Sequence, residues 1–249
     1  MTDVPIKPAA TVIIARDADP QFEIFMLRRT SAAAFAGGMY VFPGGRVDDA
    51  DASNEYEPLL TGPAEHQAGQ QQALGDGWQQ YWLAGIRETF EESGFMLAYH
   101  SDGSMLRFDD ENSPRFHDYR HQLHAGELSL ADICRKERLS LALDQIHFFN
   151  RFVTPPGRPR RFDTRFFITQ VPPSQSGLHD GFETTDSVWI SPQEALARYE
   201  QGEFELMRVT ERQLSTFNEF SSLSDFVDMA AQNDDFPTFR PQAPPVETS

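Results

Sequence analysis

The chain is poor in cysteine and in long apolar runs, and both shortages exclude classes of protein. Its 249 residues include a single cysteine, Cys134, so the chain cannot form an internal disulfide framework. One thiol fits a reducing compartment, and because no known motif surrounds Cys134 we expect it to pack in a helix. No stretch stays apolar over the length that a transmembrane helix needs. We therefore expect a soluble protein.

Neither end of the chain carries a recognisable targeting signal. The start, MTDVPIKPAA, lacks the basic segment and the apolar run of a secretory signal peptide. The last three residues differ from the Ser-Lys-Leu signal of peroxisomal proteins. We therefore expect a cytoplasmic location.

Positive charge is also scarce. Lys and Arg together number 21 and Asp and Glu number 38, which gives a formal net charge of −17. Such a surface repels nucleic acid and anionic membrane, so we expect neither as a partner. A small phosphate-bearing substrate stays compatible if metal ions and local arginines offset the field. The composition does not decide between a monomer and a homodimer.

Hydrophobic patterning predicts one α/β domain over residues 1–235. β-Branched and alternating runs predict strands at residues 9–15, 22–28, 39–43, 95–98, 165–171 and 187–190, and strand-like ends within 147–168. Periodicity and capping residues predict helices at 78–93, over most of 114–145, from Ser191-Pro192 onwards, and over about 209–231. Residues 46–77 are acidic and polar, and we interpret them as a surface insertion with solvated aspartates. The proline-rich tail, 236–249, is expected to be loosely ordered.

The densest group of candidate metal ligands lies in the segment RETFEESGF, residues 87–95. On a helix, Glu88, Glu91 and Glu92 stand at i, i+3 and i+4 and share one face. Carboxylates this close repel each other, and the dipole at a helix C-terminus disfavours them as well. A divalent cation relieves both problems, and hard oxygen ligands suit Mg²⁺ or Mn²⁺. The alternative is an acidic helix face exposed to solvent.

Other residues of this segment support a helix. Arg87 and Glu91 can pair at i, i+4, and Gly94 is a suitable C-terminal stop. The opposite face carries an apolar stripe formed by Trp78, Trp82, Ile86, Thr89 and Phe90. The helix is thus expected to bury one face and to present the carboxylates on the other.

Two adjacent glycines, Gly44 and Gly45, follow the short strand predicted at 39–43. A glycine pair directly after Pro43 indicates a sharp turn or a close approach by another part of the molecule. Two interpretations fit: an ordinary turn at a strand end, or a loop whose Gly44 carbonyl binds a metal ion beside the acidic helix.

Arginines concentrate in residues 147–168, HFFNRFVTPPGRPRRFDTRFFI, against the charge of the rest of the chain. Arginine forms forked hydrogen bonds with phosphate oxygens, so we expect a rim that binds phosphate. Compensation of surface charge is the alternative. The arginines of this segment are Arg151, Arg158, Arg160, Arg161 and Arg165.

The combination of FPGG with RETFEESGF resembles the signature of the Nudix hydrolases, G-x5-E-x7-R-E-U-x-E-E-x-G-U, where U is a bulky apolar residue. The second half is intact except at Thr89, which is semi-polar. Counted from Gly45, the first glutamate position falls on Asp51, and 35 residues separate Asp51 from Arg87. An insertion therefore splits the signature. The branch of the family related to a peroxisomal coenzyme A diphosphatase of animals carries such an insertion, and VFPGGRVD and RRFDTRFF resemble that branch too.

This resemblance implies a Nudix-type α/β/α sandwich around a mixed sheet, with a helical and loop insertion and additional helices. It implies Mg²⁺ or Mn²⁺ bound by Glu88, Glu91, Glu92 and the Gly44 carbonyl, with Arg87 orienting the carboxylates. Glu88 or a loop glutamate, Glu183, would act as general base. The candidate substrate-binding residues are Arg28, Arg29, Arg160, Arg161 and Arg165.

The function implied by the resemblance is metal-dependent hydrolysis of a diphosphate bond in a nucleoside diphosphate linked to another group. Coenzyme A or acyl-coenzyme A is the first expectation for the substrate, and ADP-ribose or a dinucleotide is the second. A Nudix-fold module that binds ligand without turnover is the alternative from a different functional class.

Overall fold

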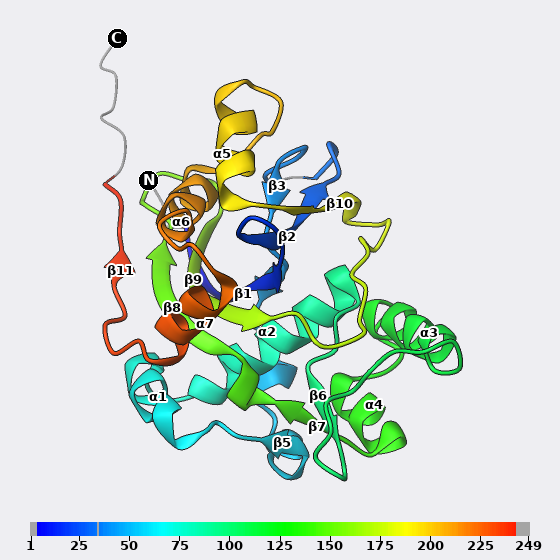
Figure 1. The fold of residues 1–249 in the computed structure, drawn as a ribbon. Coiled ribbons are helices and arrows are strands. Elements are labelled where there is room, and N and C mark those ends of the chain that lie inside the picture. Colours follow the sequence, from blue (N-terminus) through cyan, green and yellow to red (C-terminus); the bar gives the residue numbers. More distant parts are fainter. Residues whose placement is uncertain (1–3, 34, 243–249) are drawn as a thin grey trace.

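The computed structural model describes residues 4–33 and 35–242, and a mixed β-sheet forms its centre (Figure 1). The strand order is β10-β2-β1-β9-β8-β11, with β3 paired to β2 and β4 paired to β1. The two central strands, β1 and β9, are parallel, whereas β2 runs antiparallel to β1. The strands are β1 (Ile6–Asp17), β2 (Phe22–Arg29), β3 (Tyr40–Val41), β4 (Gly44–Arg46), β8 (His147–Val153), β9 (Arg161–Gln170), β10 (Thr184–Ile190) and β11 (Thr238–Phe239).

Helices cover both faces of this sheet. Ala10, Val12 and Ile14 of β1 pack in one apolar cluster with the helix α2 (Trp78–Ser93). The intervening residues, Ile13 and Ala15, pack in a second cluster with α5 (Pro192–Glu200), α6 (Arg208–Phe217) and α7 (Leu223–Ala231). Because successive side chains of a strand point to opposite faces, a strand buried on both sides reads as a continuous apolar run. The predicted α/β/α sandwich around a mixed sheet is therefore confirmed.

A second, three-stranded sheet lies beside the sandwich. It consists of β5 (Leu60–Thr61), β7 (Leu139–Ala142) and β6 (Ala98–His100), in that order. Around it lie α1 (Ala68–Leu74), α3 (Ser113–His124) and α4 (Leu130–Glu137) (Figure 1). The prediction of helix up to residue 145 is wrong for β7, because the run Leu-Ser-Leu-Ala pairs with β5 and β6. Cys134 is buried in α4, as expected, and burial raises the pKa of its thiol to about 12.

The helix α2 forms where periodicity predicts it. Trp82 and Ile86 are fully buried, and the Trp82 indole donates a hydrogen bond of 2.8 Å to the Ile146 carbonyl. The helix ends at Gly94, which adopts the left-handed conformation with φ 79°. A glycine reaches this conformation without the steric penalty that a Cβ brings.

The segment 46–77 is less exposed than its composition suggests. It contains the short helix α1 and three 3-10 helices (Asp49–Ala52, Asn54–Leu59 and Glu65–Gln67). The expectation that its aspartates are solvated is wrong for Asp51, which is only 1% exposed. The tail is also partly ordered, because β11 pairs with β8, while residues 243–249 lie outside the described residues.

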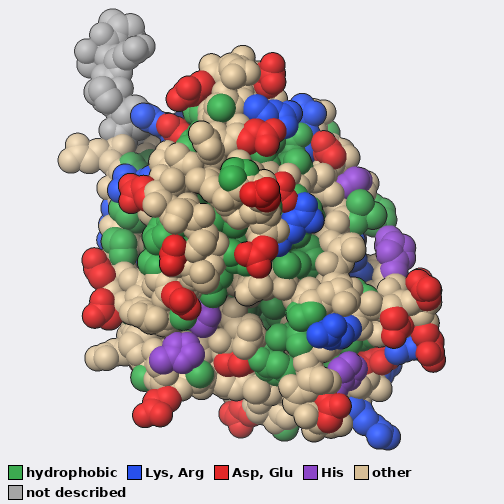
Figure 2. Space-filling model, viewed as in Figure 1, with side chains coloured by type: hydrophobic (Ala, Val, Ile, Leu, Met, Phe, Trp, Pro, Cys, Tyr) green, Lys and Arg blue, Asp and Glu red, His purple; other side chains and the backbone are tan. Residues whose placement is uncertain are grey.

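The composition predicts an acidic surface and no membrane-spanning helix. Acidic side chains are scattered over the face shown in Figure 2, in keeping with the net charge of −17. Among the helices of residues 4–33 and 35–242, none combines the length and the apolar character that a membrane span requires.

His147, at the start of β8, gives the fold a testable dependence on pH. It is 7% exposed and lies beside the ring of His66. Burial, with a smaller effect of His66, lowers the His147 pKa to about 4. The unfolded chain takes up a proton near the ordinary value of 6.5, so acid favours unfolding through this residue as pH falls from about 6.5 towards 4.

Replacing His147 with Gln should remove this sensitivity. Between pH 8 and pH 5 we expect the loss in free energy of unfolding to be smaller by about 2 kcal/mol in His147→Gln than in the wild type. Urea denaturation at both pH values measures the difference, and His100→Gln, at an exposed position, is the control. Equal losses in wild type and His147→Gln would show that His147 does not carry the effect.

Candidate active site

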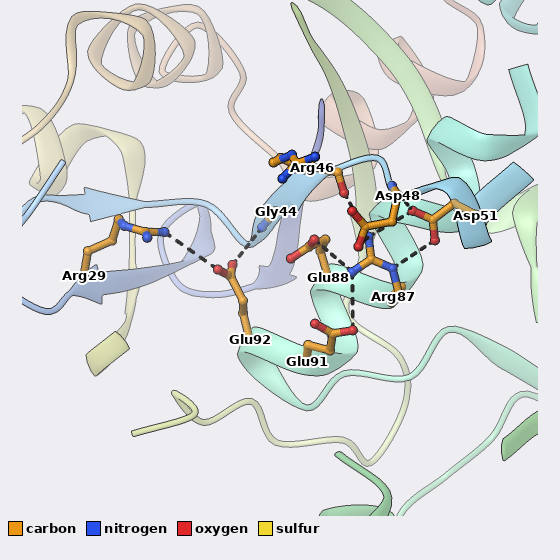
Figure 3. A network of polar contacts seen from close by, with 9 residues as sticks. All are labelled: Arg29, Gly44, Arg46, Asp48, Asp51, Arg87, Glu88, Glu91 and Glu92. Carbon is orange, nitrogen blue, oxygen red and sulfur yellow. Dashed lines mark hydrogen bonds and ion pairs between the residues drawn. The ribbon is translucent and has the colours of Figure 1, made fainter. Parts of the chain in front are cut away.

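A cavity of about 440 Å³ opens between α2, β4 and the central strands of the larger sheet. Its lining brings together the predicted carboxylates Glu88, Glu91 and Glu92, the glycine pair, and the loop residue Glu183. These residues come from segments as far apart as β4 and the loop before β10. Figure 3 shows the polar side of the cavity, where the glutamates of α2 face the strand that carries Gly44.

Arg87 is the centre of the polar network. Its Nε and Nη2 donate to the two carboxylate oxygens of Asp51, each at 2.9 Å, and Nη2 also donates to the Arg46 carbonyl at 2.9 Å. Its Nη1 donates to Glu88 Oε1 at 2.9 Å and to Glu91 Oε1 at 3.3 Å. Burial alone would lower the Arg87 pKa, but these carboxylates outweigh burial and raise it. The network gives Arg87 the means to orient Glu88 and Glu91.

Asp51 occupies the position that the signature reserves for its first glutamate. The intervening 35 residues loop away and return, so that Asp51 and Arg87 meet in a buried, bidentate ion pair. Such a forked pair fixes both groups more strictly than a single contact does. The insertion therefore leaves the two halves of the signature in contact.

The glycine pair lets β4 pass between β1 and α2. A Cβ on Gly44, which has φ 153°, would lie 2.4 Å from the Ala10 carbonyl oxygen, and a Cβ on Gly45 would lie 2.4 Å from the Glu88 carboxylate. The expected close approach is confirmed, although both glycines lie within β4 and not in a turn after the strand predicted at 39–43. The Gly44 N–H donates to Glu92 Oε2 at 2.8 Å, while a role of its carbonyl as metal ligand stays a prediction.

The three glutamates carry more negative charge than their surroundings neutralise. Burial raises the pKa of Glu88 to about 7 although Arg87 opposes it, and burial also raises the pKa of Glu91. Burial and the charge of Glu88 raise the pKa of Glu92 well above its ordinary value. A cation bound here would favour the ionised forms of all three.

The donor set fits a hard divalent cation. Each glutamate gives one oxygen to Arg87 or to the Gly44 N–H and keeps a second oxygen for another partner. Within the described residues no three His, Cys, Asp or Glu side chains are already arranged to hold an ion. Oxygen ligands at this density suit Mg²⁺ or Mn²⁺.

Glu183 and Arg29 close the opposite side of the cavity. Arg29 Nη2 lies 3.3 Å from Glu183 Oε2, and its Nη1 lies 3.9 Å from Glu92 Oε1. The Glu183 carbonyl accepts a hydrogen bond of 2.9 Å from the Thr30 N–H. The structure thus places Glu183 on the same cavity as the acidic face of α2, which makes its assignment as a candidate base geometrically possible.

The predicted arginine rim is only partly present. Of the five candidate substrate-binding arginines, Arg29 and Arg160 line the cavity. Neither Arg161 nor Arg165, both in the described part of the chain, belongs to this lining. Arg161 Nε donates to the Thr154 carbonyl at 3.2 Å, and Arg165 Nη1 lies 2.8 Å from Asp163 Oδ2.

Arg151 and Arg28 also have partners in the protein. Arg151 pairs with Asp163 at 2.6 Å, and Arg28 Nε donates to the Gly38 carbonyl at 3.2 Å. Arg28 is also absent from the described residues that line the cavity. These contacts hold β8 to β9 and the loop to β2. Of the predicted arginines, Arg29 and Arg160 thus line the cavity, and Arg46 of β4, which was not predicted, lines it as well.

The cavity also has an apolar wall, which was not predicted from the sequence. Aromatic and aliphatic side chains from three distant segments form it: Phe35, Phe152, Phe162, Phe166, Met207 and Val209. The meeting of β8 and β9 with residues 35 and 207–209 depends on the tertiary fold, so no local pattern predicts this wall. The cavity therefore has one charged side and one apolar side.

Comparisons with known proteins identify the family of the chain. The family model described as the NUDT19 Nudix domain matches residues 65–209. The chain is 26% identical to the acyl-coenzyme A diphosphatase NUDT19 of Gallus gallus, over 88% of this chain and 70% of that protein. It is 23% identical to the protein of the same name from Xenopus laevis, over 72% of this chain and 55% of the relative, so it spans little more than half of the latter.

A solved structure is similar over most of its length. The crystal structure of a NUDIX hydrolase from Alicyclobacillus acidocaldarius superposes with a TM-score of 0.77 at 26% identity. The alignment covers 90% of this chain and 96% of that chain. The likeness extends over the sandwich and the segments beside it.

The pair of Asp51 and Arg87 can be tested by its effect on stability. Asp51→Ala leaves a buried guanidinium without its bidentate carboxylate partner, so we expect a loss of about 3 kcal/mol in free energy of unfolding. Asp49→Ala, an exposed position in the same 3-10 helix, should change stability by less than about 0.5 kcal/mol. Urea denaturation compares the two, and equal losses would contradict the assignment.

Proposed function

We propose, from the premise that this chain belongs to the Nudix hydrolase family, that it hydrolyses the diphosphate bond of coenzyme A or acyl-coenzyme A with Mg²⁺ or Mn²⁺. One observation carries the proposal: the glutamates of α2, Arg29, Arg160 and an apolar wall line the same cavity. The names of the chicken and frog relatives support the choice of substrate.

Glu88, Glu91 and Glu92 would hold the metal ions. When bound, a divalent cation polarises the diphosphate and lowers the pKa of a coordinated water. Arg87 fixes one oxygen of Glu88 and one of Glu91, and the Gly44 N–H fixes one oxygen of Glu92. These contacts reduce the reorganisation that binding demands of the side chains.

The attacking water must lose a proton, and two carboxylates are placed to accept it. Glu88 lies within the cluster, and Glu183 faces the same cavity from the loop before β10. Glu183 forms an ion pair with Arg29, which restricts its position at the edge of the cavity. Both remain candidates for the general base.

The two sides of the cavity suit the two halves of the substrate. Arg29 and Arg160 supply positive charge for the phosphates, where arginine forms forked hydrogen bonds. The aromatic and aliphatic wall suits the less polar pantetheine and acyl parts. This division favours a substrate with a long, weakly polar arm over a compact nucleotide.

Three further expectations stay predictions. They are the cytoplasmic location, the absence of nucleic acid and membrane partners, and the open choice between a monomer and a homodimer. The net charge of −17 supports the second of them.

Removing single carboxylates tests the chemistry. Glu91→Gln and Glu92→Gln keep the shape but remove a charged metal ligand, so we expect kcat to fall roughly 100-fold or more in each. Mn²⁺ binding measured by isothermal titration calorimetry should weaken in parallel. Glu194→Gln, on the exposed side of α5, is the matched control. Full activity in either active-site variant would exclude its role as ligand.

A substrate panel tests the specificity. Coenzyme A, an acyl-coenzyme A, ADP-ribose and NADH are incubated with Mg²⁺ or Mn²⁺, and the products are identified by mass. We expect coenzyme A substrates to give adenosine 3′,5′-bisphosphate and a 4′-phosphopantetheine product at the highest kcat/KM. Faster cleavage of ADP-ribose or NADH would reject the substrate and leave the chemistry intact. Binding without cleavage would indicate a non-catalytic module.

A further inference from the structure

Four of the chain's seven histidines lie around one small cavity, which adjoins the acidic cleft at Glu91. This cavity has a volume of about 30 Å³ and lies between α3 and the loop before β10. Histidine side chains are visible at the right-hand edge of the face in Figure 2, near α3. The histidines of this group are His117, His121, His124 and His179.

We propose that His117 and His121 bind a divalent transition metal ion such as Zn²⁺ or Ni²⁺. The two residues stand one helical turn apart, so their side chains share one face of α3. Their Nε2 atoms share a hydrogen bond of 3.3 Å, which a bound ion would replace. Two nitrogens bound tetrahedrally to one Zn²⁺ at ordinary bond lengths lie roughly 3.3 Å apart as well. The pair therefore already has the spacing that coordination requires.

Neighbouring aromatic contacts restrict the His121 ring. Phe182 contacts it edge-on, with ring centroids 5.8 Å apart at 86°, and stacks on His124 at 5.2 Å and 14°. The ring of His117 contacts His121 at 4.5 Å. A ligand held by its neighbours loses less side-chain entropy when an ion binds.

The charges around the cavity favour a cation. Asp180 contributes one carboxylate, and Glu91, which is paired with Arg87 at 3.3 Å, contributes a second, against the guanidinium of Arg120. Arg120 is engaged with the protein, since its Nε donates to the Glu91 carbonyl at 2.8 Å. Asp180 accepts hydrogen bonds of 2.9 Å from the N–H groups of Phe182 and Thr184. Asp180 thus adds negative charge near the histidines but does not coordinate the ion.

The site would be completed by water. Both histidines are exposed at the protein surface, and no third His, Cys, Asp or Glu of the described residues is placed to join them. Imidazole is a preferred ligand of Zn²⁺ and Ni²⁺, whereas Mg²⁺ prefers oxygen, so this pair selects a different class of ion from the carboxylates of α2. The inference does not depend on the proposed hydrolase activity.

Titration with Ni²⁺ tests the site. We compare the wild-type protein with the double variant His117→Asn/His121→Asn by isothermal titration calorimetry at pH 7.5. The carboxylates of the cleft are present in both proteins, so the difference isolates the histidine pair. We expect the wild type to take up one more equivalent of Ni²⁺, with at least tenfold weaker binding at that step in the double variant. His100→Asn, an exposed histidine outside the cavity, should bind like the wild type.

A second measurement uses the unaltered protein and so does not depend on how the variants fold. Paramagnetic Ni²⁺ at low ratios should broaden the ring NMR signals of His117 and His121 before that of His100. Lowering the pH to 5.5 should abolish this broadening, because protonated imidazoles do not bind metal. Unchanged uptake by the double variant, or equal broadening of His100, would overturn the proposal.

Discussion

The arrangement of the site depends on the contacts of the buried Arg87 guanidinium. It joins the end of β4, the 3-10 helix that carries Asp51, and the acidic face of α2. A buried guanidinium is stabilised by nearby carboxylates, and carboxylates crowded on one helix are stabilised by a nearby cation. Arg87 and the carboxylates around it therefore stabilise each other. Because two of the three glutamates of α2 bond to Arg87, their positions follow from that of the guanidinium.

The glycine pair is a second consequence of the same geometry. β4 must pair with β1 and still lie close enough to α2 for the Gly44 N–H to reach Glu92. Any Cβ on these two residues would overlap the Ala10 carbonyl or the Glu88 carboxylate. Gly44 is therefore required by the short distance between β4 and the backbone of β1, and Gly45 leaves room for the Glu88 carboxylate of α2.

Local patterns predicted the parts of the site that lie on one element. Periodicity predicted the buried and acidic faces of α2, and counting along the family signature located Asp51. The role of each arginine could not be predicted in this way, because it depends on strand register. Arg151 stands opposite Arg165 across β8 and β9, and Asp163 neutralises both, so neither is available to a ligand. The strand β7 was missed for the same reason, since its partners come from residues 60–61 and 98–100.

The C-terminal end of α2 explains why this cluster stays only partly neutralised. The helix dipole adds partial negative charge to the three glutamates, and the fold offsets these charges with two guanidinium groups. Arg87 acts on the side chains, and Arg120 donates to the Glu91 carbonyl in the last turn. Glu92 has a backbone N–H and a more distant Arg29 as its partners. The remaining negative charge faces the cavity, which is the electrostatic reason for proposing that a hard cation binds there.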